Sequence, residues 1–265
     1  MTKILITGGT GTLGRVLSKL LTLKGIEHTI ASRHNPDSQR NWVHLDLLNN
    51  TGMAPAIDGK EVIFHLAHDL KKENECTKNL LDNLRNKSNT QLIYISIVGV
   101  DNIPIGYYKQ KRQSEKMIIE SGIPYSILRS TQFHDFVDKT LTQIMKFPVF
   151  FLPKNMLLQP IQTEVTAKNL AMLLTQAPTG RIDSIGGKQR YTLSELLKLW
   201  QKATNNHSFA FNLPLFGKFG KALYKGKLTC EKNASEGLSW EEWLKRKYNM
   251  NINSINKDCT DGKGT

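Results

Sequence analysis

A glycine-rich turn near the start of the chain constrains the fold more than any other feature. An apolar run at residues 4–6 leads into Thr7-Gly8-Gly9-Thr10-Gly11-Thr12-Leu13-Gly14, after which apolar residues recur at helical spacing. The stretch therefore predicts a strand, a tight turn and a helix. Glycines in such a turn permit a positive φ, let the backbone approach a pyrophosphate and let the helix pack on the strand. The helix N-terminus adds unpaired N–H groups and a partial positive charge.

The turn predicts a dinucleotide site, because the flanking strand and helix supply the context that glycine spacing alone lacks. Two spacings fit the same residues: G-x-G-x-x-G starts at Gly9, and G-x-x-G-x-x-G starts at Gly8. We expect the cofactor to contact the residues of the turn, which are Gly8, Gly9, Thr10, Gly11, Thr12, Leu13 and Gly14.

Length and composition limit the class of protein. The 265 residues are enough for a nucleotide-binding domain with a smaller appendage. No apolar run reaches the length that a bilayer requires, the first strand leaves no room for a signal peptide, and the three cysteines lack metal-ligand spacing. We therefore expect a reduced, cytoplasmic protein with no metal and no membrane as partner. The net charge of +13 is dispersed, without interleaved aromatics or a reading helix, so the sequence does not favour nucleic acid.

The end of the second predicted strand, at residues 28–32, indicates which cofactor binds. NAD-binding versions of this unit carry an acidic residue here that accepts the ribose hydroxyls. This chain has Ser32 and Arg33 instead. An arginine donates charge-assisted hydrogen bonds to a 2′-phosphate that a carboxylate would repel. We therefore expect NADP(H) to be preferred over NAD(H), with a solvated loop arginine as the alternative.

Two more candidate cofactor residues follow predicted strands. Asp46 comes after the third strand, where its carboxylate would accept from the adenine amino group or cap a helix. Ala67 ends the apolar run at residues 61–67, and its small side chain would let the ribose come close. His65 and His68 alternate to opposite faces of that run without a nearby third ligand, so they do not predict a metal site.

A serine, a tyrosine and a lysine form the candidate catalytic group. Ser96 lies near the carboxyl end of a long buried strand, the edge at which open α/β sheets bind ligands. Tyr107 and Lys111 follow at the start of a helix, four residues apart and on one face. We expect the ammonium to lower the pKa of the phenol, so that the pair relays a proton while Ser96 orients the same oxygen. Chance also produces this spacing, as Tyr108 with Arg112 shows.

The last candidate site residues follow the strand predicted at residues 125–130. Thr131 and Phe133 are expected to line the nicotinamide. Beyond residue 146 the alternation of strands and helices weakens, although Thr192 and Ser239 begin capping-box patterns that predict helices. We expect a Rossmann core at 1–146, a smaller substrate-covering region with strands and helices that join back to the core at 147–248, and a flexible tail at 249–265.

Together these motifs resemble the NmrA-like atypical short-chain dehydrogenase/reductases, an NAD(P)H-binding group. The resemblance rests on the glycine turn, on residues 94–101, on Tyr107-Tyr108 with Lys111 and Glu115, and on residues 128–136, and it extends to about residue 248 through residues 239–244. It implies an α/β fold with a Rossmann-type doubly wound parallel sheet and a small C-terminal α/β substrate-binding region. It also implies NADP(H) as cofactor and functional positions at Gly8, Gly11, Gly14, Arg33, Ser96, Tyr107 and Lys111.

The sequence thus favours an NADPH-dependent oxidoreductase that transfers a hydride to a small organic acceptor of quinone, dye or carbonyl type. Lys111 would hold the cofactor ribose, and Ser96 and Tyr107 would handle the proton. Ser96 and Tyr107 are closer together than in ordinary short-chain dehydrogenases, so an NADP(H)-binding redox sensor without turnover is the alternative. A small-molecule substrate is the expected partner, and the oligomeric state stays open.

Overall fold

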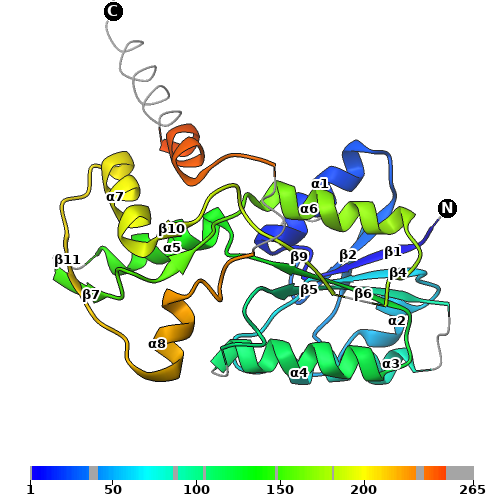
Figure 1. Ribbon diagram of the computed structural model, residues 1–265. Helices are drawn as coiled ribbons and strands as arrows, with labels where there is room; N and C mark the ends of the chain where they lie inside the picture. The colour runs from blue at the N-terminus through cyan, green and yellow to red at the C-terminus, as the bar shows by residue number, and fades with distance from the viewer. Residues whose placement is uncertain are drawn as a thin grey trace, which may run out of the picture. The chain divides into compact units, whose positions relative to one another are not determined.

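The computed structural model describes residues 2–35, 41–85, 89–103, 106–146, 149–180, 182–230 and 236–248. Figure 1 traces its helices and strands. The chain divides into two compact units: the first comprises Met1–Ser130 and Thr163–Ile185, and the second comprises Thr131–Gln162 and Gly186–Thr265.

The first unit is built on a seven-stranded sheet whose strands all run parallel, in the order β3-β2-β1-β4-β5-β6-β9. The order reverses between β1 and β4, and open α/β sheets bind their ligands at such a switch point. This sheet confirms the predicted doubly wound α/β fold. Its strands are β1 (Ile4–Thr7), β2 (His28–Ser32), β3 (Trp42–His44), β4 (Val62–His65), β5 (Gln91–Ile97), β6 (Tyr125–Ser130) and β9 (Ile182–Ile185).

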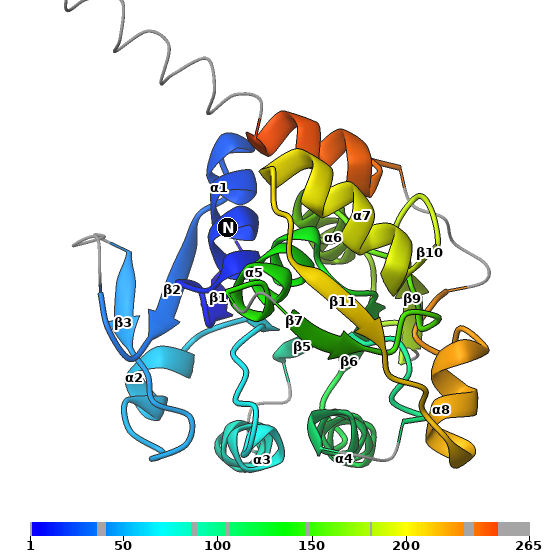
Figure 2. The same cartoon turned by 90° about the vertical axis from the view of Figure 1, so that its left-hand side faces the viewer.

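Helices cover both faces of this sheet. As Figure 2 shows, α1 and α6 lie on one face, where they pack together, and α2, α3 and α4 lie on the other. The core beneath α2, α3 and α4 is mostly aliphatic, and it also contains the buried Tyr94 of β5 and Cys76 of α3. The helices are α1 (Thr12–Leu23), α2 (Met53–Ile57), α3 (Glu73–Leu84), α4 (Gly106–Glu120) and α6 (Thr163–Met172), and the short 3-10 helix Leu173–Thr175 follows α6.

The predicted strand, turn and helix at the start of the chain are confirmed. All four residues of β1 are buried. Helix α1 buries Leu13, Leu17 and Leu21, whose four-residue spacing places them on one face. The helix ends at Leu23 with Lys24 as its C-cap residue, and Gly25 follows with a φ of +68°, the left-handed conformation that ends many helices.

The second unit contains two short ribbons and several helices. Strands β8 (Leu157–Leu158) and β10 (Tyr191–Thr192) pair antiparallel, whereas β7 (Val149–Leu152) and β11 (Phe209–Asn212) pair parallel. Both predicted capping boxes are confirmed, because Thr192 and Ser239 each exchange hydrogen bonds with the glutamate three residues on. The helices are α5 (His134–Ile144), α7 (Leu193–Thr204), α8 (Gly217–Tyr224) and a final helix at residues 240–248.

The division into units differs from the boundary expected at residue 146. Helix α6 packs on α1 and β9 pairs with β6, so residues 163–185 belong to the first unit. The second unit begins at Thr131. Residues 249–265, where a flexible tail is expected, lie outside the described residues. In the described part of the chain, no helix combines the length and apolar character needed to cross a membrane.

Candidate functional site

The glycine turn has the geometry of a phosphate-binding loop. Gly8 has a φ of +67°, and a Cβ at this position would lie 2.6 Å from backbone atoms of Ala67. A Cβ at Gly14 would lie 2.3 Å from the carbonyl oxygen of Gly8, so glycine is needed for α1 to begin this close to the turn. Gly11 is the N-cap residue of α1, and no side chain caps it. The first N–H groups of α1 therefore have no intrahelical acceptor and are suited to bind an anion.

The space around the other residues of the turn differs from one position to the next. A Cβ at Gly9 would lie 2.0 Å from Cγ2 of Ile30, whereas at Gly11 the nearest atom would be 3.2 Å away. The backbone carbonyl of Thr10 accepts a 2.8 Å hydrogen bond from Nε of Arg15. Both predicted glycine spacings end at Gly14, but the positive φ belongs to Gly8. Thr12 begins α1, and Leu13 is buried beneath it.

Ser32 and Arg33 lie at the carboxyl end of β2, and their side chains differ in the hydrogen bonds that they form with the described residues. The Ser32 hydroxyl donates to the carbonyl of His34 at 2.6 Å and accepts from Nε1 of Trp42 at 2.9 Å. Arg33 is exposed, and no described residue forms a hydrogen bond or ion pair with its guanidinium. Asp69 lies close enough to Arg33 to experience its charge. The guanidinium is thus available to a ligand, and the Ser32 hydroxyl is engaged within the protein.

Asp46 caps a turn rather than a helix. Its Oδ1 accepts from the backbone N–H groups of Leu48 and Asn49, at 3.0 and 3.1 Å. Helix α2 begins later, at Met53, with Gly52 as its N-cap residue. The helix-capping interpretation of Asp46 is therefore wrong. The carboxylate instead shapes the loop after β3, and its contact with an adenine ring stays a prediction.

Lys111 is anchored in the interior by Glu73. Its Nζ lies 2.7 Å from Oε1 of Glu73 and donates to the carbonyl of Ile95 at 2.9 Å. Tyr94 donates its hydroxyl to the same Oε1 at 2.8 Å, and its ring centroid lies 4.4 Å from Nζ. Burial alone raises the pKa of Glu73, but the charge of Lys111 and the hydrogen bonds from Lys111 and Tyr94 outweigh it and lower that pKa. The carboxylate is therefore charged and balances the ammonium.

A chain of buried polar side chains connects this ion pair to the end of β1. Thr77 donates its hydroxyl to the backbone carbonyl of Glu73 at 3.1 Å and lies 3.2 Å from Nε2 of His65. Nδ1 of His65 lies 3.0 Å from Oγ1 of Thr7, which also accepts from the N–H of Ala67 at 3.3 Å. Burial lowers the pKa of His65 to about 4, so its imidazole is neutral. These hydrogen bonds link Thr7, at the start of the glycine turn, to the backbone of Glu73, whose side chain pairs with Lys111.

Tyr107 shares a face of α4 with Lys111, as predicted, but its expected pKa shift is wrong. The Tyr107 ring centroid lies 5.6 Å from Nζ of Lys111. Burial first, and the charge of Glu73 second, raise the pKa of Tyr107 above its ordinary value. The lysine does not lower it, because Glu73 neutralises the ammonium. The phenol therefore stays protonated at neutral pH, and the ring of His68 lies beside it with a centroid distance of 6.5 Å.

Ser96 has a buried hydroxyl with no hydrogen-bond partner among the described residues. Successive side chains alternate along a strand, so Ser96 lies on the same sheet face as Tyr94, the face covered by α3 and α4. The residue before it, Ile95, supplies the carbonyl that holds Lys111. A buried hydroxyl without a partner is costly, and a ligand oxygen would satisfy it.

Thr131 and Phe133 belong to the second unit. Thr131 is buried, and Phe133 is the N-cap residue of α5 and forms a parallel bridge with Ile161. The imidazole of the next residue, His134, lies fully buried against Trp240, at a ring centroid distance of 5.6 Å. The contact of Thr131 and Phe133 with a nicotinamide stays a prediction.

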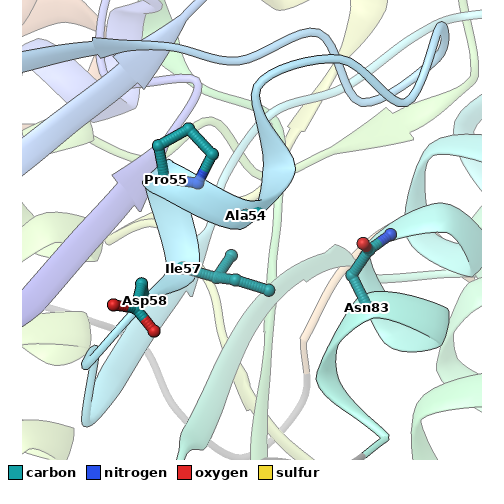
Figure 3. A pocket seen from close by; sticks show the side chains of 5 residues that line it. All are labelled: Ala54, Pro55, Ile57, Asp58 and Asn83. Atoms are coloured by element: carbon teal, nitrogen blue, oxygen red, sulfur yellow. The ribbon is translucent and has the colours of Figure 1, made fainter.

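Two hollows on the first unit lie outside the candidate catalytic group. Along α1 and β2, a hollow of about 370 Å³ is lined by Gly9, Arg15, Ser18, Lys19, Thr22, Leu23 and Ile30. Figure 3 shows the other, of about 350 Å³, with Asn83 of α3 opposite α2; its lining is Ala54, Pro55, Ile57, Asp58 and Asn83. In the part of the chain that the structure describes, no three His, Cys, Asp or Glu side chains are grouped to hold a metal.

A parallel sheet with a glycine turn after β1, at the switch point of the strand order, defines a Rossmann-type nucleotide-binding protein. The sequence model of the NAD(P)H-binding family matches residues 8–171. The chain belongs to this NAD(P)H-binding family, as its sequence motifs predict. No curated protein matches the chain in sequence.

Solved structures share the fold at low sequence identity. An NADPH-dependent quinone oxidoreductase from Escherichia coli, complexed with NADPH, is 17% identical over 92% of this chain and 99% of its own, with a TM-score of 0.77. A nucleoside-diphosphate-sugar epimerase from Staphylococcus aureus is 19% identical over 92% and 99%, with a TM-score of 0.76. A UDP-glucuronic acid 4-epimerase from Bacillus cereus, in complex with UDP-glucuronic acid and NAD, is 18% identical over 94% and 98%, with a TM-score of 0.72. These likenesses show that the chain shares one Rossmann-type fold with the oxidoreductase and with both epimerases.

Sequence reasoning missed two residues of the candidate site. Glu73 opens α3 and carries the charge that balances Lys111, which lies 38 positions later in the sequence. His68 lies beside Tyr107, although the sequence draws attention to it only as a rejected metal ligand. The local signal for Glu73 is an acidic residue at a helix start, which ordinarily indicates interaction with the helix dipole.

Proposed function

We propose that the protein is a cytoplasmic NADPH-dependent oxidoreductase that reduces a small organic acceptor of quinone, dye or carbonyl type. The observation that carries this proposal is the buried Ser96 hydroxyl, which has no described partner and lies one residue from the carbonyl that holds Lys111. A structural serine at this depth would ordinarily be satisfied within the protein. Because the Ser96 hydroxyl at the carboxyl end of β5 has no partner among the described residues, it can form a hydrogen bond with an oxygen of an acceptor.

The first unit offers separate groups for the pyrophosphate, the 2′-phosphate and the adenine of NADPH. The free N–H groups of α1 and the turn from Gly8 to Gly14 would bind the pyrophosphate, and Ala67 lies against that turn. Arg33 would bind the 2′-phosphate, because its guanidinium is exposed and unpaired among the described residues. Asp46 would lie near the adenine, and Thr131 and Phe133 near the nicotinamide. Bound nicotinamide supplies the hydride.

The proton-handling groups are Ser96 and Tyr107. Because its pKa is raised, Tyr107 carries its proton at neutral pH and would donate it to an acceptor oxygen that Ser96 holds. The Lys111 ammonium has three N–H groups. It donates one to Glu73 and one to the carbonyl of Ile95, which leaves the third for a ribose hydroxyl. Lys111 in this proposal holds the cofactor and does not activate the phenol.

A second function has a specific observation in its favour. The pKa of Tyr107 is raised and Lys111 is paired with Glu73, and both observations weaken the proposed proton relay. A redox sensor that binds NADP(H) without turnover would not need such a relay. A screen of NADPH oxidation against quinones, dyes and carbonyl compounds, with NADPH binding measured in parallel, separates the two functions. The reductase proposal predicts turnover with at least one class of acceptor. NADPH binding without oxidation by any acceptor would overturn it and favour the sensor.

A further inference from the structure

The β7–β11 ribbon of the second unit presents an apolar face to solvent. Val149 and Phe151 of β7 are opposite Phe209 and Phe211 of β11 in the register. All four are at least half exposed, with Phe209 at 72% and Phe151 at 64%. The Phe151 and Phe211 rings pack together, with centroids 5.7 Å apart. We call these four residues the aromatic face. An exposed apolar patch of this kind is typical of an interaction surface.

The apolar surface continues along the chain beyond β11. Leu213 and Phe216 follow the strand, and Phe216 is 83% exposed immediately before α8. Figure 2 shows the chain running from β11 into α8. Helix α8 buries Gly220 and Leu223, while Lys218 and Lys221 are exposed. The helix is therefore amphipathic, with a basic outer side.

Lysine is the only charged residue type in the two sequence segments that contain the aromatic face. Residues 139–162 and 196–230 contain no Asp, Glu or Arg. Among the described residues, no acid forms an ion pair with the lysines that flank β7 or with those of α8 and the residues just after it. These lysines are Lys146, Lys154, Lys218, Lys221, Lys225 and Lys227. An unpaired charge of one sign is complementary to an anionic surface.

Residue types distinguish a lipid surface from a protein partner. Protein interfaces are enriched in arginine and depleted in lysine, which is the reverse of what surrounds this face. A symmetric contact with a second copy would bring two sets of these lysines together, and like charges oppose such a contact. Phenylalanines that enter the headgroup boundary, together with lysines that bind anionic headgroups, are typical of peripheral membrane proteins.

We propose that the aromatic face and the lysines around it dock on an anionic phospholipid surface. Phe151, Phe209, Phe211 and Phe216 insert at the headgroup boundary, and the flanking lysines bind the lipid phosphates. The sequence expectation of no membrane partner rests on the lack of a spanning segment, which does not bear on a surface contact. The proposal is independent of the reductase activity, because all its residues lie in the second unit and outside the candidate catalytic group.

The test is co-sedimentation of the full-length chain with vesicles of phosphatidylcholine, with and without phosphatidylglycerol. We expect binding to the anionic vesicles that weakens as salt is raised. The Phe151→Ser/Phe211→Ser double variant is expected to lose it, and Lys218→Gln/Lys221→Gln to lower the partition coefficient about fivefold for each lysine removed.

Matched variants in the first unit serve as controls. Leu23→Ser/Ile119→Ser removes two exposed apolar side chains, and Lys24→Gln/Lys168→Gln removes two exposed lysines; both are expected to bind vesicles as the parent chain does. Thermal unfolding and NADPH binding establish that each variant is folded. Equal binding to both vesicle types, no binding to either, or equal effects of the control variants would overturn the proposal. The proposal would also be overturned if the parent chain bound no vesicles and the Phe151→Ser/Phe211→Ser variant had a different oligomeric state from the parent. That result would indicate that the aromatic face binds a second copy of this chain.

Discussion

The Nζ atom of Lys111 lies 2.7 Å from Oε1 of Glu73, and both side chains are buried. This ion pair sets the charge state of the candidate site, because it leaves Tyr107 beside a neutralised ammonium. A buried pair of this kind need not stabilise the fold relative to apolar residues, but the loss of one partner leaves the other charge uncompensated.

The Glu73→Gln variant is therefore expected to lose about 3–5 kcal/mol of unfolding free energy. The double variant Glu73→Gln/Lys111→Met removes both charges and is expected to regain much of that loss. Urea denaturation of the four members of this double-mutant cycle measures the coupling. Additive losses in the double variant would show that the two side chains do not form a pair in solution.

Tyr107→Phe is expected to lower turnover about 10²-fold and to leave NADPH affinity unchanged, because only the donated proton is removed. Tyr108→Phe is the matched control, since Tyr108 is the next residue of α4 and has no assigned role. Because the pKa of Tyr107 is raised, the rate is expected to show no decline from phenol ionisation below about pH 10. A basic limb near neutral pH that disappears in Tyr107→Phe would contradict the raised pKa.

Much of the fold follows from local sequence patterns, whereas the contacts within the site do not. The glycine turn, the buried strand that carries Ser96 and the capping box at Thr192 are all visible over a few residues, and the structure confirms them as elements. The pairing of Glu73 with Lys111 depends on how α3 packs against α4, which no short pattern contains. The return of β9 to the sheet beside β6 is also a long-range contact, and it is the reason that residues 163–185 belong to the first unit.

Gly8→Ala is expected to reduce NADPH binding, because its Cβ would lie 2.6 Å from the backbone of Ala67 and displace the turn. Gly25→Ala is the matched control, with a φ of +68° against +67° at Gly8 but no atom within 4 Å of its Cβ. Both variants have similar backbone strain, about 1 kcal/mol. NADPH titration of the two variants isolates the effect of the close approach. Equal affinities would show that the turn tolerates the displacement.

Two buried histidines are expected to lower the free energy of unfolding at acidic pH. Burial lowers the pKa of His65 and of His134 to about 4, against an ordinary value of 6.5 in the unfolded chain. Between these two pH values the unfolded chain therefore binds more protons than the folded chain. The histidine contribution to the free energy of unfolding is fully present above pH 6.5 and is lost as pH falls toward 4. Each histidine contributes up to about 3 kcal/mol of this decline.

His134→Gln tests this expectation, because it removes one of the two titrating groups. Unfolding free energies measured by urea denaturation between pH 7 and pH 4 should decline less steeply in the variant than in the parent chain. The absolute stability of the variant at pH 7 is not the readout, since the Nε2 contact with the Pro160 carbonyl is also altered. Parallel curves for variant and parent would exclude His134 as a source of the pH dependence.

Arg33→Gln is expected to weaken NADPH binding by roughly ten- to a hundredfold and to leave NADH binding unchanged, because only the 2′-phosphate loses its charged partner. Arg15→Gln, which alters a cation on the same unit that contacts the Thr10 carbonyl, serves as a comparison. It is expected to affect both cofactors alike. A similar loss for both cofactors in Arg33→Gln would remove the basis for NADPH selectivity.

The most direct test of the account is a fluorescence titration of the parent chain with NADPH and, in parallel, with NADH. The account predicts NADPH binding that is at least about tenfold tighter than NADH binding, through the glycine turn and Arg33 together. Equal affinities would contradict the NADPH preference and leave the NAD(P)H-binding fold in place. Binding of neither cofactor would contradict the central claim that this chain is an NADPH-dependent oxidoreductase.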